Sequence, residues 1–180
     1  MIETERLVLR PFTHDDADRL FDMFRRPEVA RWSGNGKPMT SIDEAHARID
    51  RHPVRRGTHP AAGIFAAELK VSGEMAGMCM LVPIPPSEGV ARSPDQEMEI
   101  GWHFHPQEWG NGYATEGATA LVERAFAAGI PELYSVTDPD NAPSQAVCRR
   151  LGMAELGLRS DWYDRELRAF CLEGPGEPVN

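Results

Sequence analysis

The sequence contains few cysteines, and the three that are present, Cys79, Cys148 and Cys171, lie far apart. There is no Cys-x-x-Cys pair, and the His103-x-His105 pair has no third potential metal ligand nearby in the sequence. Closely spaced Cys and His residues are the usual sign of disulfide frameworks and zinc sites. We therefore expect neither of these, and no bound metal.

Long apolar runs are also missing, and none approaches the roughly 20 residues that a membrane-spanning helix needs. Residues 1–6 lack the basic-then-apolar order of a secretory signal. Hydrophobic residues make up 41% of the chain and charged residues 26%, values typical of a globular protein. We expect a cytoplasmic protein with no membrane partner, formed by one domain over residues 1–173 and a flexible Gly/Pro-rich tail over residues 174–180.

Positive charge is scarce, since the formal net charge of the 180 residues is −9. Residues 1–60 are almost balanced, so residues 61–180 carry nearly all of the excess negative charge. Nucleic-acid binding needs a basic face, and we expect no such partner. The acidity would suit a cationic substrate such as an amine, or it only provides solubility.

The remaining pattern alternates strands and helices. Composition and periodicity predict strands at residues 6–10, 64–70, 75–82, 96–104, 133–137, 153–160 and 166–173. They predict helices at about residues 13–26, 41–52, 112–128 and 141–152. Residues 83–95, with four prolines, are expected to form an exposed excursion. This order predicts a mixed α/β fold with one central sheet.

A glycine-containing loop, residues 107–112 (Gln-Glu-Trp-Gly-Asn-Gly), lies between a predicted strand and a predicted helix. Gly110 and Gly112 allow a tight turn and a close approach of a ligand to the backbone. The free N–H groups at the start of the next helix favour an anion. The loop is therefore either a cradle for a pyrophosphate or a plain tight connection. It lacks the Lys of a Walker loop, and Thr115 replaces the third glycine of a dinucleotide fingerprint.

Three segments in order resemble a known family. Residues 107–116 read Gln-x-x-Gly-x-Gly-Tyr-Ala-Thr-Glu, which resembles the acetyl-CoA-binding motif of the GNAT acetyltransferase superfamily. Asn141-Ala-Pro-Ser144, followed by Leu151-Gly-Met153, resembles the family's Asn-x-x-Ser…Leu-Gly-Phe element. The opening, residues 4–11, is similar to that of the branch containing the ribosomal-protein N-terminal (RimJ/RimL-type) acetyltransferases. Residues 33–95 carry no signal of this kind.

The resemblance implies the GNAT fold: a single mixed sheet of about six to seven strands that splays after the 96–104 strand and has helices on both sides. It also implies acetyl-CoA as co-substrate, with the pyrophosphate on backbone amides of the glycine loop and the pantetheine arm along the preceding strand. The cofactor-binding residues so implied are Trp102, His103, Phe104, Gln107, Gly110, Asn111, Gly112, Tyr113, Ala114, Thr115, Asn141 and Ser144. Asn141 has the alternative role of a plain helix cap.

Glu99 begins a Glu-Ile-Gly-Trp run that resembles the family's Glu-Ile-x-aromatic stretch, in which the Glu is the general base of histone-type members. Period-2 alternation places it on one face of its strand with Glu97, Gly101 and His103. Gly101 is expected to leave open space beside Glu99 for the acyl group. Alternatively, Glu99 is a structural carboxylate paired with an Arg, and Glu97 or His103 is the base.

The resemblance also suggests which residue acts as the general acid. Many family members carry a Tyr seven residues after the capping Asn, where this chain has Cys148. Ser144, the substitute seen in the ribosomal-protein branch, is therefore the candidate acid, with a local hydrogen bond at the helix start as its alternative role. A CoA thiol leaves well enough to need no acid. Tyr163, in a predicted hairpin turn, would border the acceptor site.

These features together imply an acetyl-CoA-dependent N-acetyltransferase. The acceptor would be a primary amine, on a protein N-terminus or a small molecule, and it would attack the thioester directly in a ternary complex. A homodimer is compatible with the sequence. Two alternatives are a non-catalytic acyl-CoA-binding sensor and a nucleotide-binding module, and the missing Walker Lys and third glycine disfavour the module.

Overall fold

The structure is a computed structural model that describes residues 1–91 and 97–175. Its helices are α1 (Ala17–Phe24), α2 (Pro27–Ala30), α3 (Ile42–Arg55), α4 (Tyr113–Ala127) and α5 (Ala142–Arg150), with short 3-10 turns η1 (His14–Asp16) and η2 (Pro106–Glu108). Its strands are β1 (Ile2–Glu3), β2 (Leu7–Pro11), β3 (Gly63–Leu69), β4 (Met75–Pro83), β5 (Met98–Phe104), β6 (Glu132–Thr137), β7 (Ala154–Arg159) and β8 (Leu167–Glu173).

All eight strands form one sheet in the order β1-β2-β3-β4-β5-β6-β8-β7. Every neighbouring pair is antiparallel except β5 and β6, which run parallel. The mixed α/β fold expected from the sequence is confirmed. The strand count of six to seven is too low by the two-residue strand β1, which is too short to show any alternation.

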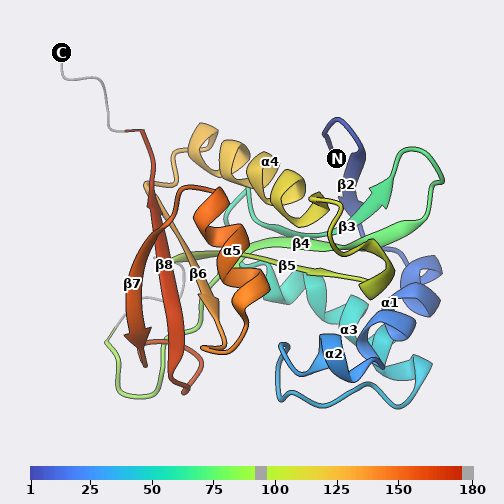
Figure 1. Cartoon of the computed structure of the whole chain (residues 1–180), viewed down its shortest axis with the longest axis horizontal. Coiled ribbons are helices and arrows are strands. Elements are labelled where there is room, and N and C mark those ends of the chain that lie inside the picture. The colour runs from blue at the N-terminus through green and yellow to red at the C-terminus, as the bar shows by residue number, and fades with distance from the viewer. Residues whose placement is uncertain (92–96, 176–180) are drawn as a thin grey trace.

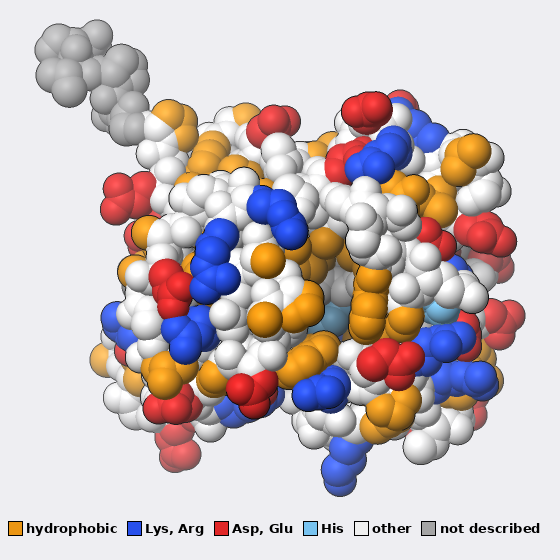
Figure 2. Space-filling model, in the orientation of Figure 1, with side chains coloured by type: hydrophobic (Ala, Val, Ile, Leu, Met, Phe, Trp, Pro, Cys, Tyr) orange, Lys and Arg blue, Asp and Glu red, His pale blue; other side chains and the backbone are white. Residues whose placement is uncertain are grey.

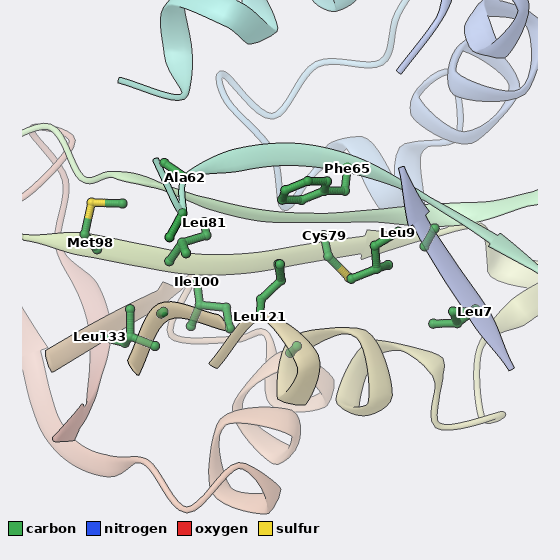
Figure 3. Close-up of a cluster of buried hydrophobic side chains, with 14 of the residues drawn as sticks. Leu7, Leu9, Ala62, Phe65, Cys79, Leu81, Met98, Ile100, Leu121 and Leu133 are labelled. Carbon is green, nitrogen blue, oxygen red and sulfur yellow. The ribbon is translucent and has the colours of Figure 1, made fainter. Parts of the chain in front are cut away.

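Helices cover both faces of the sheet (Figure 1). On one face, α4 packs against the inner strands, and Gly117 allows the approach: a Cβ at Gly117 would lie 2.7 Å from the Cys79 sulfur. Figure 3 shows this core, in which Leu121 of α4 faces Ile100 and Leu81 of the sheet. On the other face, α1, α2 and α3 bury a second cluster, which includes Leu20, Phe24, Val29, Ile49 and Met78.

The sheet splays between β5 and β6, as expected. These two strands pair only at Met98↔Leu133 and Glu99↔Tyr134, although β5 continues to Phe104. In Figure 1 the strands β3, β4 and β5 run across the view, whereas β6, β8 and β7 stand almost upright. Within the described residues, the carboxyl-terminal half of β5 therefore has no strand beside it on the β6 side.

Some local expectations need correction. The helix expected at about residues 13–26 ends at Phe24, before Pro27, and Pro27 then begins a separate short helix, α2, where its missing N–H costs nothing. The helix α3 continues past His52 and Pro53 to Arg55. The start of the expected excursion at 83–95 is not exposed throughout, since Ile84 and Ser87 are buried. Residues 92–96 and 176–180, which include parts of the excursion, strand and tail predicted there, lie outside the described residues.

Candidate functional site

The glycine loop and the start of α4 present a row of free backbone donors. Gly110 and Gly112 have φ angles of 81° and 83°, in the left-handed region where a side chain is disfavoured. Within the described part of the chain, the backbone N–H groups of residues 110–115 meet no acceptor. Consecutive free N–H groups at a helix N-terminus are a suitable cradle for a phosphate or pyrophosphate.

The N-terminal segment holds this loop in place. The Arg6 guanidinium donates to the carbonyl of Asn111 (3.0 Å) and forms an ion pair with Glu116 (2.6 Å) on the first turn of α4. The Thr4 hydroxyl donates to the same carboxylate (2.6 Å). Burial disfavours the charge on Glu116, but the hydrogen bonds from Thr4 and Arg6 outweigh it and lower its pKa. The motif at residues 4–11 was recognisable in the sequence, but its role in holding the glycine loop was not predicted.

Side chains from the strand end complete the support of the loop. The Trp109 indole N–H donates to the carbonyl of Phe104 (2.8 Å), and the buried His105 ring accepts from the backbone N–H of Gln107 (3.3 Å). The Gln107 side chain itself is exposed. The glycines are thus fixed by contacts on both sides of the turn, so their N–H groups are oriented before any ligand binds.

The open edge of β5 lies next to this cradle. The Glu97 carbonyl and the His105 N–H both bond to partners on the β4 side (2.9 Å each), so the backbone of odd-numbered residues points to β4. The backbone of Trp102 therefore points to the open edge, where an extended ligand could pair with it. The backbone of His103 points to β4, which removes His103 from the backbone contacts expected for the pantetheine arm. The Phe104 carbonyl already accepts from Trp109.

Glu99 lies on the face of β5 that is opposite α4 and is buried, with 5% of its surface exposed. The Tyr163 hydroxyl donates to its carboxylate, and the Arg55 guanidinium lies 3.6 Å from it. Arg55 also donates to the Tyr163 oxygen (2.6 Å). Burial raises the pKa of Glu99, although Tyr163 and Arg55 oppose this shift. Glu99 therefore has an Arg partner, as expected for a structural carboxylate. Its pKa is also displaced toward that of a base acting near neutrality.

Tyr163 reaches Glu99 from the turn between β7 and β8. Tyr163 and Asp164 have φ angles of 61° and 52°, which are unusual for residues other than glycine. The Asp164 N–H donates to the Ser87 hydroxyl (2.9 Å), and the Tyr163 N–H to the Pro85 carbonyl (3.2 Å). This turn is therefore held against the segment that follows β4 in a costly conformation, which is often found at functional sites.

The two other candidate bases are less suited to the task. The Glu97 carboxylate accepts a hydrogen bond from the buried Trp162 indole (2.8 Å). The His103 ring packs edge-on against Phe24 (5.2 Å between centroids), and burial followed by the charge of Arg48 lowers the pKa of His103 to about 3. A histidine with that pKa is a weak proton acceptor at neutral pH.

Gly101 does not leave the open space that the sequence suggested. A Cβ at Gly101 would lie 2.5 Å from the terminal methyl of Met80, the residue opposite it on β4. The space beside Glu99 is therefore filled by a side chain. Methionine is flexible, and Met80 is only half-buried, so a ligand could displace its end without moving the strand.

The start of α5 lies across the splay from β5. Asn141 caps α5, and its side-chain oxygen accepts from the Ser144 N–H (3.3 Å), which confirms its capping role. Ser144 is half-buried on the first turn, and Cys148 is fully buried on the same helix. On β6, the buried Thr137 hydroxyl finds no hydrogen-bond partner among the described residues. An orphaned hydroxyl at the end of β6, beyond the last pairing of β6 with β5, fits a polar ligand lying there.

The surface is hollowed between α5 and the β5–α4 connection, and hydrophobic side chains border the hollow on both sides (Figure 2). A CoA-like molecule fits these surroundings: its pyrophosphate has the free N–H groups, and its peptide-like arm has the open strand edge. Within residues 1–91 and 97–175, no group of three His, Cys, Asp or Glu side chains could hold a metal ion. In the same residues, no helix is both long and apolar enough to cross a membrane.

The half-buried His52 of α3 predicts how stability depends on pH. Burial, followed by Arg48 and Arg51, lowers the pKa of His52 to about 4, and neither ring nitrogen has a partner among the described residues. Below about pH 6.5 the unfolded chain binds a proton that folded His52 does not, so stability falls from about pH 6.5 to about pH 4. His52→Phe should remove about 1–3 kcal/mol of this loss. Urea unfolding at about pH 6.5 and about pH 4 measures this loss of unfolding free energy, and His59→Phe is the control. If His52→Phe lost as much stability as the unaltered protein, the prediction would be wrong.

Comparison with known proteins identifies relatives of the chain. Residues 6–154 match the family described as acetyltransferase (GNAT) domain. The FsC-acetyl coenzyme A-N(2)-transacetylase of Aspergillus fumigatus is 30% identical over 165 residues, covering 91% of this chain and 68% of that protein. An acetyltransferase structure (GNAT family) from Bacillus anthracis has a TM-score of 0.77 at 18% identity, covering 96% of this chain and 97% of that one. RimL, a ribosomal L7/L12 alpha-N-protein acetyltransferase in complex with coenzyme A, has a TM-score of 0.74 at 18% identity, covering 95% and 96%.

Proposed function

The chain belongs to the GNAT acetyltransferase family and is an acyltransferase, and we propose that it transfers the acetyl group of acetyl-CoA to a primary amine on a small molecule or a protein N-terminus. The observation that carries the proposal is the row of free N–H groups at residues 110–115, placed beside the open edge of β5. The free N–H groups suit the pyrophosphate of CoA, and the open strand edge suits its amide-containing arm. The amine would enter on the opposite face of β5, where Glu99 lies.

In this proposal, the residues that hold acetyl-CoA are the backbone of residues 110–115, the backbone of Trp102, and the side chains at the start of α5. Bound acetyl-CoA supplies a thioester carbonyl as electrophile. The loop contacts of Arg6 and Trp109 orient the N–H donors in advance, which reduces the ordering cost of binding. Asn141 both caps α5 and borders the splay.

Glu99 is proposed as the general base. An amine is an ammonium ion near neutral pH and must lose a proton before it can attack the thioester. The buried Glu99 carboxylate has a raised pKa, and the Tyr163 hydroxyl bound to it connects it to the β7–β8 turn. Because Glu99 is only 5% exposed, we expect the proton to reach it through a water molecule. Arg55 keeps the carboxylate oriented.

Direct attack in a ternary complex is proposed over a covalent cysteine intermediate. Burial raises the pKa of Cys148 to about 11 and that of Cys79 to about 12, so neither thiol provides a thiolate near neutral pH. Both side chains are also fully buried. Ser144 is the proposed donor of a proton to the departing CoA sulfur.

Acetyl-CoA should stabilise the protein strongly, and ATP and NAD should not. A ligand at about 100 times its dissociation constant adds about 2.7 kcal/mol of stability, which raises the melting temperature of a chain of this size by about 5–10 °C. Thermal unfolding with each ligand at equal concentration measures this. A larger shift with ATP or NAD than with acetyl-CoA would contradict the proposed cofactor.

Turnover separates an enzyme from a binding protein. Release of free CoA thiol should depend on an added amine and should yield an equal amount of acetylated amine. A chain that binds acetyl-CoA but releases no thiol with a broad mixture of amines would instead be the acyl-CoA-binding sensor.

A further inference from the structure

Arg48 of α3 is a half-buried cation without an anionic partner. Its guanidinium lies over the ring of Phe24 at 4.0 Å from the centroid. Throughout the described ranges it forms no hydrogen bond and no ion pair, although most arginines of this chain pair with a carboxylate or a carbonyl. None of its nitrogens is among the buried side-chain atoms that lack a partner, so the five donors of this guanidinium remain accessible to an acceptor from outside the chain.

The position of Arg48 places it on the acceptor side of the proposed active site. Phe24 also contacts the ring of His103, which lies on the same face of β5 as Glu99. On α3, residues 48, 52 and 55 follow the helical spacing of one face, and Arg55 at the end of this row reaches Glu99. Arg48 is therefore two turns along the helix from the partner of the proposed base, about 10 Å away.

From this geometry we infer that Arg48 binds a carboxylate of the acceptor, so that the substrates are amines that also carry a carboxylate. The inference rests on the proposed function and names its substrate class. The positive charge of Arg51, on the next turn of the same helix, acts on Arg48 and would also attract a carboxylate. Burial and Arg51 lower the pKa of Arg48 to about 10, which still leaves it charged at neutral pH.

The separation of the two groups limits the length of the acceptor. Glu99 and His103 are four residues apart on an extended strand, which corresponds to about 13 Å. Arg48 and Arg55 are seven residues apart on α3, which corresponds to about 10 Å. An extended residue spans at most about 3.6 Å, so about three to four residues bridge the gap. The carboxylate would thus be the C-terminus of a short peptide or an acidic side chain near the N-terminus of a longer one.

Peptide pairs that differ only in the carboxylate test the inference. Triglycine and its C-terminal amide present nearly the same amine, and a longer peptide amide with Asp or Asn at its third residue tests the side-chain source. With acetyl-CoA, we expect kcat/KM to be about 10- to 100-fold higher for the acid of at least one pair, as for a hydrogen-bonded ion pair. Which pair shows the preference identifies the source of the carboxylate.

Two variants assign the preference to Arg48. Arg48→Met keeps the packing on Phe24 without the charge and should bring kcat/KM for the acid down to that for the amide, while Arg48→Lys should keep part of the preference. The matched control is Arg31→Met, because Arg31 also lies over an aromatic ring, that of Trp32 (4.1 Å), but is exposed, and it should keep the full preference. Equal rates for acid and amide in the unaltered protein, or a preference that survives in Arg48→Met, would overturn the inference.

Failure of the proposed function gives a different pattern. If no peptide is acetylated, calorimetry of the CoA-bound protein with N-acetyl-triglycine and its amide shows whether Arg48 binds a carboxylate independently of catalysis. Tighter binding of the acid that is lost in Arg48→Met supports the carboxylate site, and equal binding of the two peptides refutes it.

Discussion

Replacing Glu99 by Gln should lower kcat/KM for amine acetylation at least about 100-fold near neutral pH. A positioned general base typically contributes about 10²- to 10⁴-fold, and Gln keeps the shape of the side chain without its basicity. The affinity for acetyl-CoA should barely change, because Glu99 lies on the face of β5 opposite α4. Steady-state kinetics and calorimetry on the same preparations measure both quantities.

The pH profile makes this prediction specific to a base. In the unaltered protein the rate should rise with pH through the raised pKa of Glu99, since only the carboxylate accepts a proton. In Glu99→Gln the rate should partly return at high pH, where more of the free amine is already neutral. Glu97→Gln is the matched control, because it still accepts the Trp162 hydrogen bond. If the Glu99→Gln protein kept a near-normal rate at all pH values, Glu99 would not be the base, and its role would be that of a structural partner of Arg55.

Replacing Gly112 by Val should weaken acetyl-CoA binding on the order of 100-fold. The side chain would stand where a phosphate approaches the loop, and a φ of 83° disfavours a β-branched residue, so the N–H groups would turn away. Each charge-assisted hydrogen bond lost costs about 1.5–3 kcal/mol, and one or two such losses give this factor. Calorimetric titration with acetyl-CoA measures it.

Gly129→Val is the control for backbone strain. Gly129 ends the same helix with a φ of 81° and has no atom within 4 Å of an added Cβ, so its substitution causes similar strain far from the loop. It should lower the melting temperature as Gly112→Val does and leave the affinity unchanged. Equal affinity in Gly112→Val and the unaltered protein would place the cofactor elsewhere.

Local sequence patterns predicted much of the fold. The strands β2, β3, β4, β5 and β6 and the helix α4 lie within a few residues of their expected bounds, and the alternation of β5 correctly placed Glu99 and His103 on one face. These elements have strong periodicity or clear end signals. The strand β1 was missed because two residues carry no period.

The surroundings of the site were harder to predict, because they depend on contacts between distant segments. Nothing in the sequence near Glu99 indicates that Arg55 and Tyr163 meet there, or that Met80 fills the space beside Gly101. In the same way, Arg48 is one of several arginines on a weakly patterned helix, and only the fold shows that it has no anionic partner among the described residues.

The central claim is that this chain catalyses acetyl transfer from acetyl-CoA to an amine. Mass spectrometry of a mixture of amines and short peptides, incubated with acetyl-CoA and the protein, tests it most directly. The account predicts products heavier by one acetyl group, formed in proportion to the CoA released and strongly reduced with Glu99→Gln. Binding of acetyl-CoA without any acetylated product, or product formed equally by Glu99→Gln, would contradict it.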